Sequence, residues 1–419
     1  MPFRLLLPAL LAALTLPATA QTPPPLALDD AVALAAQQSA QLAARRAQAR
    51  SATEMAVAAG QRPDPRLTLA LTNVPVDGPQ AGSITRDFMT MRSVGLMQTL
   101  TRDDKLIARR ERMVREADIA AADEQVERAA LQREAAWAWL DRSLQLERRD
   151  LLRALVDEAR HQADAAEAVY RSGGGAQADL FASRAAIERL HDHLDQAQRD
   201  ADIAQARLAR WIGEAAARAP APRPALIRPP WTAADLDAAL QRHPQVEAAD
   251  RLRGLADAEH ALADANRRAD WSVELMFSQR GPSYSNMVSL NLSVPLQWDR
   301  AERQDREVAA RQAMRERADA LREDRHRAAL AEVRAALEAW DSHDHRLRRF
   351  DERLLPLAAQ RSDAALAAYR AGGGSLAAVL AARSNQIDTR LDRLAIEAQI
   401  ARVWADLHYL LPRDERTAP

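Results

Sequence analysis

The sequence has 419 residues, of which 28% are charged and only 4% are aromatic, and its formal net charge is -1. This length leaves room for more than one domain, and the nearly cancelled charge excludes a nucleic-acid surface, which needs a clustered basic excess. The complete absence of cysteine excludes disulfides, thiolate metal sites and cysteine nucleophiles.

Residues 1–20 have the pattern of a secretory signal peptide. Arg4 supplies the positive start, residues 5–16 form an apolar core, and Ala18-Thr19-Ala20 precedes the expected cleavage. The apolar core is too short for a membrane-spanning helix, and no other segment approaches ~18 consecutive apolar residues. We therefore expect an exported chain without a transmembrane helix.

The first half of the chain predicts two helical arms around a β-hairpin. A helix is expected from about Leu28 to Gly60, where prolines follow. Residues 67–72 alternate between apolar and polar side chains, which predicts a strand in a hairpin at about 66–100. A long helix from Thr101 to about Ser172 contains neither proline nor glycine, and another helix runs to about Trp211.

The second half repeats this layout with a clearer hairpin at about 270–298. Trp271, Val273, Leu275 and Phe277 share one face, and a returning strand over 288–294 alternates in the same way. The long helix that follows, from about Asp299 to Ala371, contains Pro356, which predicts a kink.

Two glycine triplets mark the equivalent turns of the two halves. Each triplet follows a Tyr-Arg pair: Tyr170-Arg171 precedes Gly173, Gly174 and Gly175, and Tyr369-Arg370 precedes Gly372, Gly373 and Gly374. Two other pairs of segments match in the same order, which indicates an internal duplication. The expected parts are a signal peptide (1–20), a first repeat (21–219), a proline-rich connector (220–230), a second repeat (231–412) and a tail (413–419).

Helix length and strand number together predict the architecture. Each long helix would span ~105 Å at ~1.5 Å per residue, and two shorter helices would stack beside it to a similar length. Four strands cannot close into a barrel, and an open sheet in lipid would leave its edges unsatisfied. The fold class we expect is mainly α with a small membrane β-barrel, formed by twelve strands in a homotrimer.

These features resemble the outer-membrane efflux protein (TolC) family over essentially the whole mature chain. The motifs that carry the resemblance are the helix entry at 239–246, the strand exit at 294–298, and Leu355-Pro356-Leu357-Ala358 leading to Tyr369-Arg370-Ala371-Gly372. The resemblance implies a trimer in the outer membrane that extends into the periplasm. It also implies tips that contact a periplasmic adaptor (membrane fusion) protein, and an inner-membrane transporter that supplies the energy.

The resemblance also implies a gate at the tips. Asp179 and Tyr369 match gate positions of the family, whereas Gly374 stands where an arginine is expected, and Ala378 and Ala381 replace a pair of aspartates. Arg370, Arg171 and Arg184 are candidate substitutes, and Tyr170 is the first-repeat equivalent of Tyr369. The alternatives are that both tyrosines only pack at helix ends and that Asp179 only favours a helix N-terminus.

Other candidate sites are weaker. Trp271 and Trp298 at strand ends suit the aromatic girdles of membrane barrels. The strand methionines would contact soft cations or simply fill a narrow barrel; they are Met89, Met91, Met97, Met276 and Met287. Histidines two apart on a helix, at 191 and 193 and at 343 and 345, point to nearly opposite sides. We therefore expect no metal site and no cofactor.

No catalytic motif is present, so we predict a passive conduit of a tripartite efflux pump and not an enzyme. The likeness to the cobalt-zinc-cadmium branch of the family favours heavy-metal cations as substrate. Drug or solute export by the same fold is one alternative. The other is a periplasmic coiled-coil adaptor or structural protein.

Overall fold

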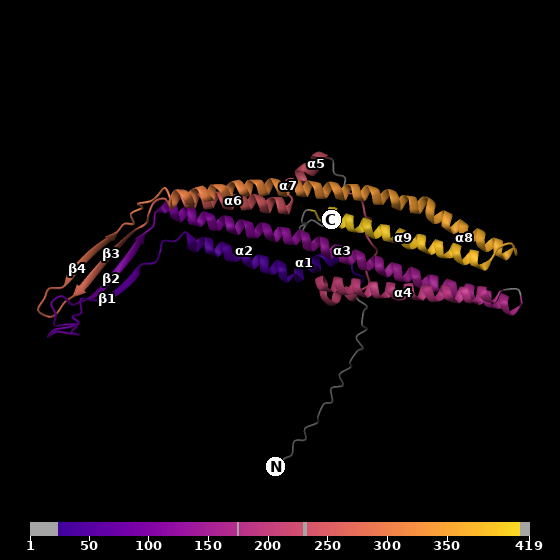
Figure 1. Ribbon diagram of the computed structural model, residues 1–419, viewed down its shortest axis with the longest axis horizontal. Coiled ribbons are helices and arrows are strands. Elements are labelled where there is room, and N and C mark those ends of the chain that lie inside the picture. The colour runs from indigo at the N-terminus through magenta and orange to yellow at the C-terminus, as the bar shows by residue number, and fades with distance from the viewer. Residues whose placement is uncertain (1–23, 174–175, 229–232, 411–419) are drawn as a thin grey trace, which may run out of the picture.

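The computed structural model describes residues 24–173, 176–228 and 233–410. The chain is elongated, with a β-sheet at one end, helices running side by side along its length, and two helical turns at the other end (Figure 1). The predicted signal peptide (1–20) and tail (413–419), Gly174, Gly175 and the last residues of the connector lie outside the described residues.

The first repeat is built on one long helix. Helix α3 covers Asp103–Arg171, 69 residues, or about 104 Å at ~1.5 Å per residue. Two shorter helical segments lie beside it end to end, as predicted: α1 and α2 toward the sheet and α4 toward the tip (Figure 1). Their bounds are Leu28–Gln38 for α1, Ala40–Ala59 for α2, and Gln177–Ile212 for α4, which a 3₁₀ turn over Gly213–Ala217 follows.

The single helix predicted from Leu28 to Gly60 is wrong, because the chain breaks at Ser39. The Ser39 hydroxyl accepts a hydrogen bond from the Leu42 backbone N–H (3.2 Å) and so caps the start of α2. Serine competes in this way with the helical backbone, which makes it a good N-cap and a weak interior residue.

The second repeat follows the same plan with its long helix interrupted. Its helices are α5 (Ala233–Gln241), α6 (Pro244–Ala265), α7 (Gln304–Arg349), α8 (Leu355–Arg370) and α9 (Leu376–His408), and a π-helical turn over Phe350–Leu354 joins α7 to α8. Helix α7 begins after the predicted Asp299. The predicted kink lies at the π turn, because Pro356 in the first turn of α8 cannot donate a backbone hydrogen bond.

The sheet is antiparallel in the order β1-β2-β3-β4 and joins the two repeats through the β2–β3 pair. The strands are β1 (Arg66–Thr72), β2 (Met91–Leu100), β3 (Trp271–Gln279) and β4 (Met287–Ser293). Strand β4 ends one residue before the predicted Val294. Leu67 pairs with Leu96, which pairs with Leu275, which pairs with Leu290.

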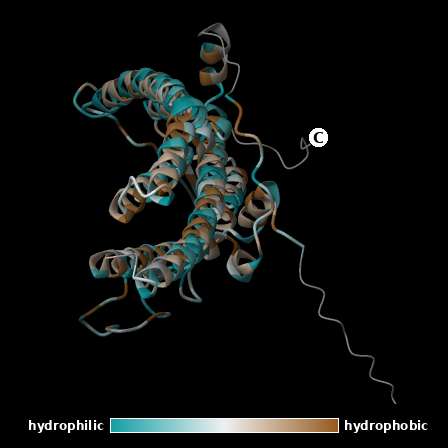
Figure 2. Cartoon of the chain, turned by 90° about the vertical axis from the view of Figure 1, so that its right-hand side faces the viewer, coloured by the Kyte–Doolittle hydropathy of each residue, from teal (hydrophilic) through white to brown (hydrophobic). Residues whose placement is uncertain are grey.

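The main hydrophobic core lies halfway along the molecule, where α1, α3, α4 and α9 meet. Trp139 is fully buried there and its indole N–H donates to the Leu26 carbonyl (3.0 Å). Many of the other buried hydrophobic residues are alanines, whose small side chains leave room for neighbouring helices to pack closely. Viewed from the tip end, the helices form a curved layer and not a compact bundle (Figure 2).

Candidate functional site

One face of the sheet is apolar and exposed to its full width. Two rows of aligned side chains cross all four strands: Leu67, Leu96, Leu275 and Leu290, then Leu69, Val94, Phe277 and Val288. All of them are exposed, Leu69 to 76% and Leu290 to 71%. A monomeric soluble protein rarely exposes such a patch. This face is therefore a surface for lipid or for another molecule.

The opposite face of the sheet is mostly polar or small. Ser93 and Ser278 share a buried hydroxyl–hydroxyl hydrogen bond of 2.8 Å between β2 and β3. Met97, Met276 and Met287 lie on this face, opposite the leucine rows. An apolar face backed by a polar one is the pattern of a strand between lipid and an aqueous interior.

Strands β1 and β4 form the two edges of the sheet within the described residues. An edge strand presents unpaired N–H and C=O groups, so it is ready to pair with another chain. The exposed apolar face runs out to both edges, because Leu69 lies on β1 and Val288 on β4. A single chain with two open sheet edges would therefore leave backbone hydrogen-bonding groups unsatisfied in lipid.

Both predicted interface tryptophans lie near the helical end of the sheet. Trp271 begins β3 opposite Leu100 and is half exposed. Trp298 is 87% exposed, but it lies in the link between β4 and α7 and not at the end of a strand. Their role as membrane-interface aromatics stays a prediction.

The tip turns depend on glycine at the positions where the helices end. Gly173 and Gly372 have φ of 82° and 76°, the left-handed geometry that closes helices with little penalty only for glycine. The Gly173 N–H donates to the Tyr170 carbonyl and the Gly372 N–H to the Tyr369 carbonyl, both at 3.0 Å. A Cβ at either glycine would meet nothing within 4 Å, so the tip backbone is open to a partner.

Gly374 is required for a different reason. A Cβ there would lie 3.0 Å from the Tyr369 nitrogen and 3.1 Å from the Ala368 carbonyl carbon. Any side chain in this position therefore requires the end of α8 to shift by a few tenths of an ångström.

Gly374→Ala is therefore expected to destabilise the second tip turn, because backbone atoms of Ala368 and Tyr369 must shift to admit the added Cβ. The loss should be about 1–3 kcal/mol, the usual cost of overpacking. Hydrogen exchange of the α8 and α9 ends would measure it, and Ser375→Ala, which removes only the cap of α9, gives a reference. Unchanged exchange after Gly374→Ala would contradict this account.

The two tyrosines differ in their surroundings. Tyr369 is half-buried against Leu376 and Val379, across the second tip turn. Tyr170, its first-repeat equivalent, is 39% exposed. Within one chain Tyr369 thus has a packing role, while Tyr170 presents its ring at the surface.

The charged gate candidates are only partly brought together. Asp179 lies in the first turn of α4, but its side chain is outside the described part of the chain. Arg171 and Arg184 both form ion pairs with Glu167, and so connect the end of α3 to α4. Glu167 was not identified from the sequence, because its partner Arg184 lies beyond the turn. Arg370 is exposed on α8.

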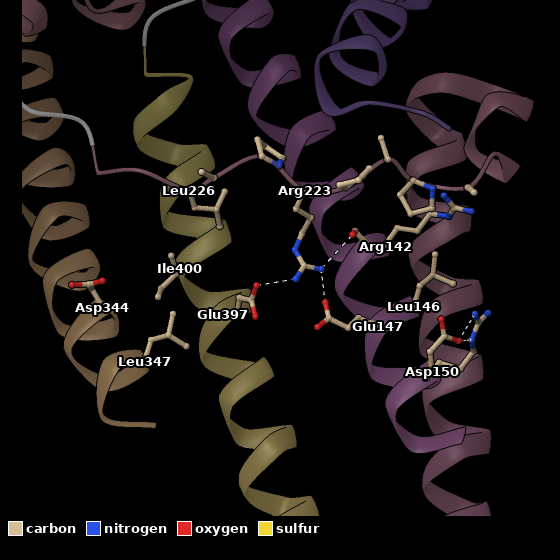
Figure 3. A pocket seen from close by; sticks show the side chains of 18 of the residues that line it. Arg142, Leu146, Glu147, Asp150, Arg223, Leu226, Asp344, Leu347, Glu397 and Ile400 are labelled. Atoms are coloured by element: carbon tan, nitrogen blue, oxygen red, sulfur yellow. Dashed lines mark hydrogen bonds and ion pairs between the residues drawn. The ribbon is translucent and has the colours of Figure 1, made fainter. Parts of the chain in front are cut away.

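The connector between the repeats forms a clamp that sequence reasoning missed. It crosses α3 and α9 beside a cavity of about 1100 Å³ (Figure 3). Arg223 lies between two carboxylates: its guanidinium is 2.6 Å from Glu147 on α3 and 2.8 Å from Glu397 on α9. This pair of contacts joins the first repeat to the second. Arg223 is only 19% exposed, so the contacts are partly shielded from solvent.

The clamp continues to the bend in the second repeat. Arg393 lies 2.5 Å from Glu397 and 2.7 Å from Asp351, which is in the π turn. The hydrogen bond to Asp351 raises the pKa of Arg393. One chain of ion pairs thus runs from α3 through the connector to the bend between α7 and α8.

A buried histidine marks the break between α5 and α6. His243 lines a cavity of about 310 Å³ together with Arg133, Glu332 and Asp406. Its Nδ1 is buried, with no hydrogen-bond partner in the part of the chain that is described. Burial lowers the pKa of His243 below its ordinary 6.5, although Glu332 opposes the shift. Burial raises the pKa of Asp406.

We expect the protein to lose stability as the pH falls through the range just below 6.5. Because the pKa of His243 is lowered on folding, its contribution to stability is present above its unfolded pKa and is lost when the imidazole must be protonated. Asp406 has a raised pKa, so its contribution to stability changes with pH in the opposite direction. This change occurs at lower pH, nearer the ordinary carboxyl pKa of 3.8. Melting temperatures of His243→Gln between pH 7 and 5 should show a smaller slope than wild type.

The control for this pH dependence is His193→Gln, which removes an exposed imidazole from α4. Its slope is the reference for the loss of an exposed imidazole. Equal slopes in His243→Gln and wild type would show that His243 does not titrate on unfolding.

The other histidines do not assemble into a metal site. His191 contacts Arg160 through its Nε2 at 3.2 Å. Over residues 24–173, 176–228 and 233–410, no three His, Asp or Glu side chains are placed to hold one metal ion. Over the same ranges, none of the helices is both long and apolar enough to cross a membrane.

Comparison with solved structures identifies the fold. The outer-membrane channel OprN superposes with a TM-score of 0.78 at 18% identity, over 92% of this chain and 90% of that chain. CusC, whose structures describe transmembrane channel formation, gives 0.76 at 16% identity over 92% of each chain. The outer-membrane protein VceC from Vibrio cholerae gives 0.72 at 16% identity, over 91% of this chain and 95% of its own.

No protein-family model and no curated protein matches the sequence. The likeness to these channels is therefore one of fold, over nearly the whole length of both chains. It confirms the predicted fold class of long helices with a few strands per protomer.

Proposed function

We propose that this chain, which has the fold of outer-membrane channels, is a member of the outer-membrane efflux protein (TolC) family. Three copies would form a passive conduit in the outer membrane that extends into the periplasm. A periplasmic adaptor would contact the helical tips, and an inner-membrane transporter would supply the energy.

The observation that carries this proposal is the exposed apolar face of a sheet with two open edges. Lipid would cover the leucine rows, and neighbouring copies would pair β4 of one chain with β1 of the next. Three copies of a four-stranded sheet give twelve strands, enough to enclose an aqueous interior lined by the polar face.

The helices support the same assembly. The curved layer in Figure 2 would form one third of a hollow cylinder. The open backbone of the tip turns offers a partner helix a close approach. The ion-pair chain through Arg223 would hold the two repeats of each copy at a fixed separation.

Membrane fractionation and planar-bilayer recording test the conduit directly. The protein should be recovered with the outer membrane, and the purified oligomer should conduct ions. Recovery in the soluble periplasm would instead support the adaptor or structural alternative and would overturn the channel assignment.

The gate is part of the proposal. Asp179→Ala combined with Tyr369→Phe is expected to raise the conductance of the purified trimer, because a contact that holds neighbouring tips together would be lost. Arg327→Ala, which breaks an exposed ion pair with Glu323 within α7 and lies outside the gate candidates, is the control. Equal conductance in all three proteins would leave Asp179 and Tyr369 with packing roles only.

Growth assays of a deletion strain assign the substrate class. Sensitivity to cobalt, zinc or cadmium that the intact gene corrects would support the heavy-metal branch. Sensitivity restricted to antibiotics would assign drug or solute export instead.

A further inference from the structure

Charge is scarce in the sheet and unevenly placed. The four described strands contain three charged side chains: Arg66 on β1, Arg92 on β2 and Glu274 on β3. Arg92 aligns with Leu71, and so lies on the apolar side near the loops, where it donates to the Arg280 carbonyl at 3.3 Å. Arg66 and Glu274 lie on the polar face.

Arg66 and Glu274 also share one row across the sheet. Arg66 aligns with Met97, Met97 with Glu274, and Glu274 with Asn291. The other rows of the polar face contain only hydroxyl, small and methionine side chains. The only charges on this face of the described strands are therefore one cation and one anion at one level.

The Glu274 carboxylate is held on this face by its neighbours. Asn291 donates its amide to Oε2 at 3.4 Å. The other oxygen lies over Gly95, where an added Cβ would come within 3.2 Å of Oε1. Glycine at position 95 thus leaves the space that the carboxylate occupies.

The two charges are close enough to act on one passing ion. Adjacent strands lie ~4.8 Å apart, so Arg66 and Glu274 are separated by about 10 Å along the row. That distance is comparable with the ~8 Å screening length at physiological ionic strength. If the polar face lines the interior, each copy contributes one positive and one negative group to the same short stretch.

We propose that Arg66 and Glu274 are the residues that set the charge preference of the conduit. This inference rests on the proposed channel function. Their opposite charges balance, so the sheet region admits cations and anions alike and favours solutes that carry both charges or neither. Removing one of the two charges from every copy would leave a ring of charges of a single sign, and this ring would favour ions of the opposite sign.

The reversal potential of the purified oligomer in a planar bilayer under a KCl gradient tests this. Glu274→Gln should shift the permeability toward chloride, and Arg66→Gln toward potassium. A unit charge ~6 Å away in water changes local ion concentration about threefold, so we expect shifts of that order. The double variant should return to the wild-type value, because its row carries no charge.

Arg92→Gln is the matched control, since it removes the same charge from the apolar side and should leave the reversal potential unchanged. Single-channel conductance of each variant shows that it has folded and assembled. Conducting variants with the wild-type reversal potential would overturn the role of Arg66 and Glu274 and leave the channel intact. Absence of conductance in wild type would overturn the channel function itself.

Discussion

For the trimeric channel proposed above, replacing Leu290 with arginine is expected to remove the protein from the membrane fraction and to prevent stable trimers. Leu290 lies on an edge strand, 71% exposed, at the end of the row that starts at Leu67. An arginine on the lipid side of a barrel costs ~2–4 kcal/mol at the bilayer midplane, and a trimer carries three of them. Outer-membrane fractionation and gel analysis of the unheated oligomer would measure the loss.

Ser289→Arg provides the control within the same strand. Ser289 is adjacent in sequence but points to the polar face, opposite Met276. The same charge should therefore be tolerated there, because the side chain would enter an aqueous interior. Trimeric, membrane-bound Leu290→Arg protein would show that the apolar face does not meet lipid.

Replacing Arg223 with alanine is expected to lower the free energy of unfolding by about 2 kcal/mol per chain, between the loss for an exposed pair and that for a fully buried one, because Arg223 and Glu397 are mostly shielded while Glu147 is 47% exposed. Glu397, 18% exposed, would lose one guanidinium partner and keep Arg393. Glu147 on α3 would lose its contact with the connector. Thermal and denaturant unfolding followed by circular dichroism would measure the change.

Arg171→Ala is the matched control for Arg223→Ala. Its ion pair with Glu167 also joins an arginine to a glutamate, but Arg171 is 75% exposed, so the loss should be at most ~1 kcal/mol. The double variant Arg223→Ala with Glu397→Gln should be less than additive if the two side chains act together. Equal effects of Arg171→Ala and Arg223→Ala would show that the clamp is no stronger than a surface pair.

Much of the fold can be predicted from the periodicity of apolar residues and from the positions of proline and glycine. The uninterrupted run after Thr101 predicts a single long helix, and α3 covers Asp103–Arg171. Alternation over 67–72 predicts β1 to within one residue. These features are readable because they depend on local geometry: a helix needs no proline, and a half-exposed strand repeats every two residues.

The predictions that differ from the structure concern positions where two local backbone conformations have similar free energies. Ser39 ends α1 because its hydroxyl caps the next helix, and nothing in the helical pattern distinguishes a serine that caps from one that is tolerated. The π turn before Pro356 similarly places the bend a few residues earlier than the proline itself. Such choices depend on small free-energy differences that neighbouring helices settle.

The long helices, the two hairpins with their alternating faces, and the glycine turns can be predicted from the amino-acid sequence, because each depends on spacing along the chain. Which distant side chains meet becomes visible only in the folded chain. Arg223 reaches Glu147 and Glu397 on two different helices, and strand register alone puts Arg66 and Glu274 in one row. A shift of register by one residue would move Glu274 from the polar to the apolar face of the sheet. That physical constraint is visible only once the strands are paired.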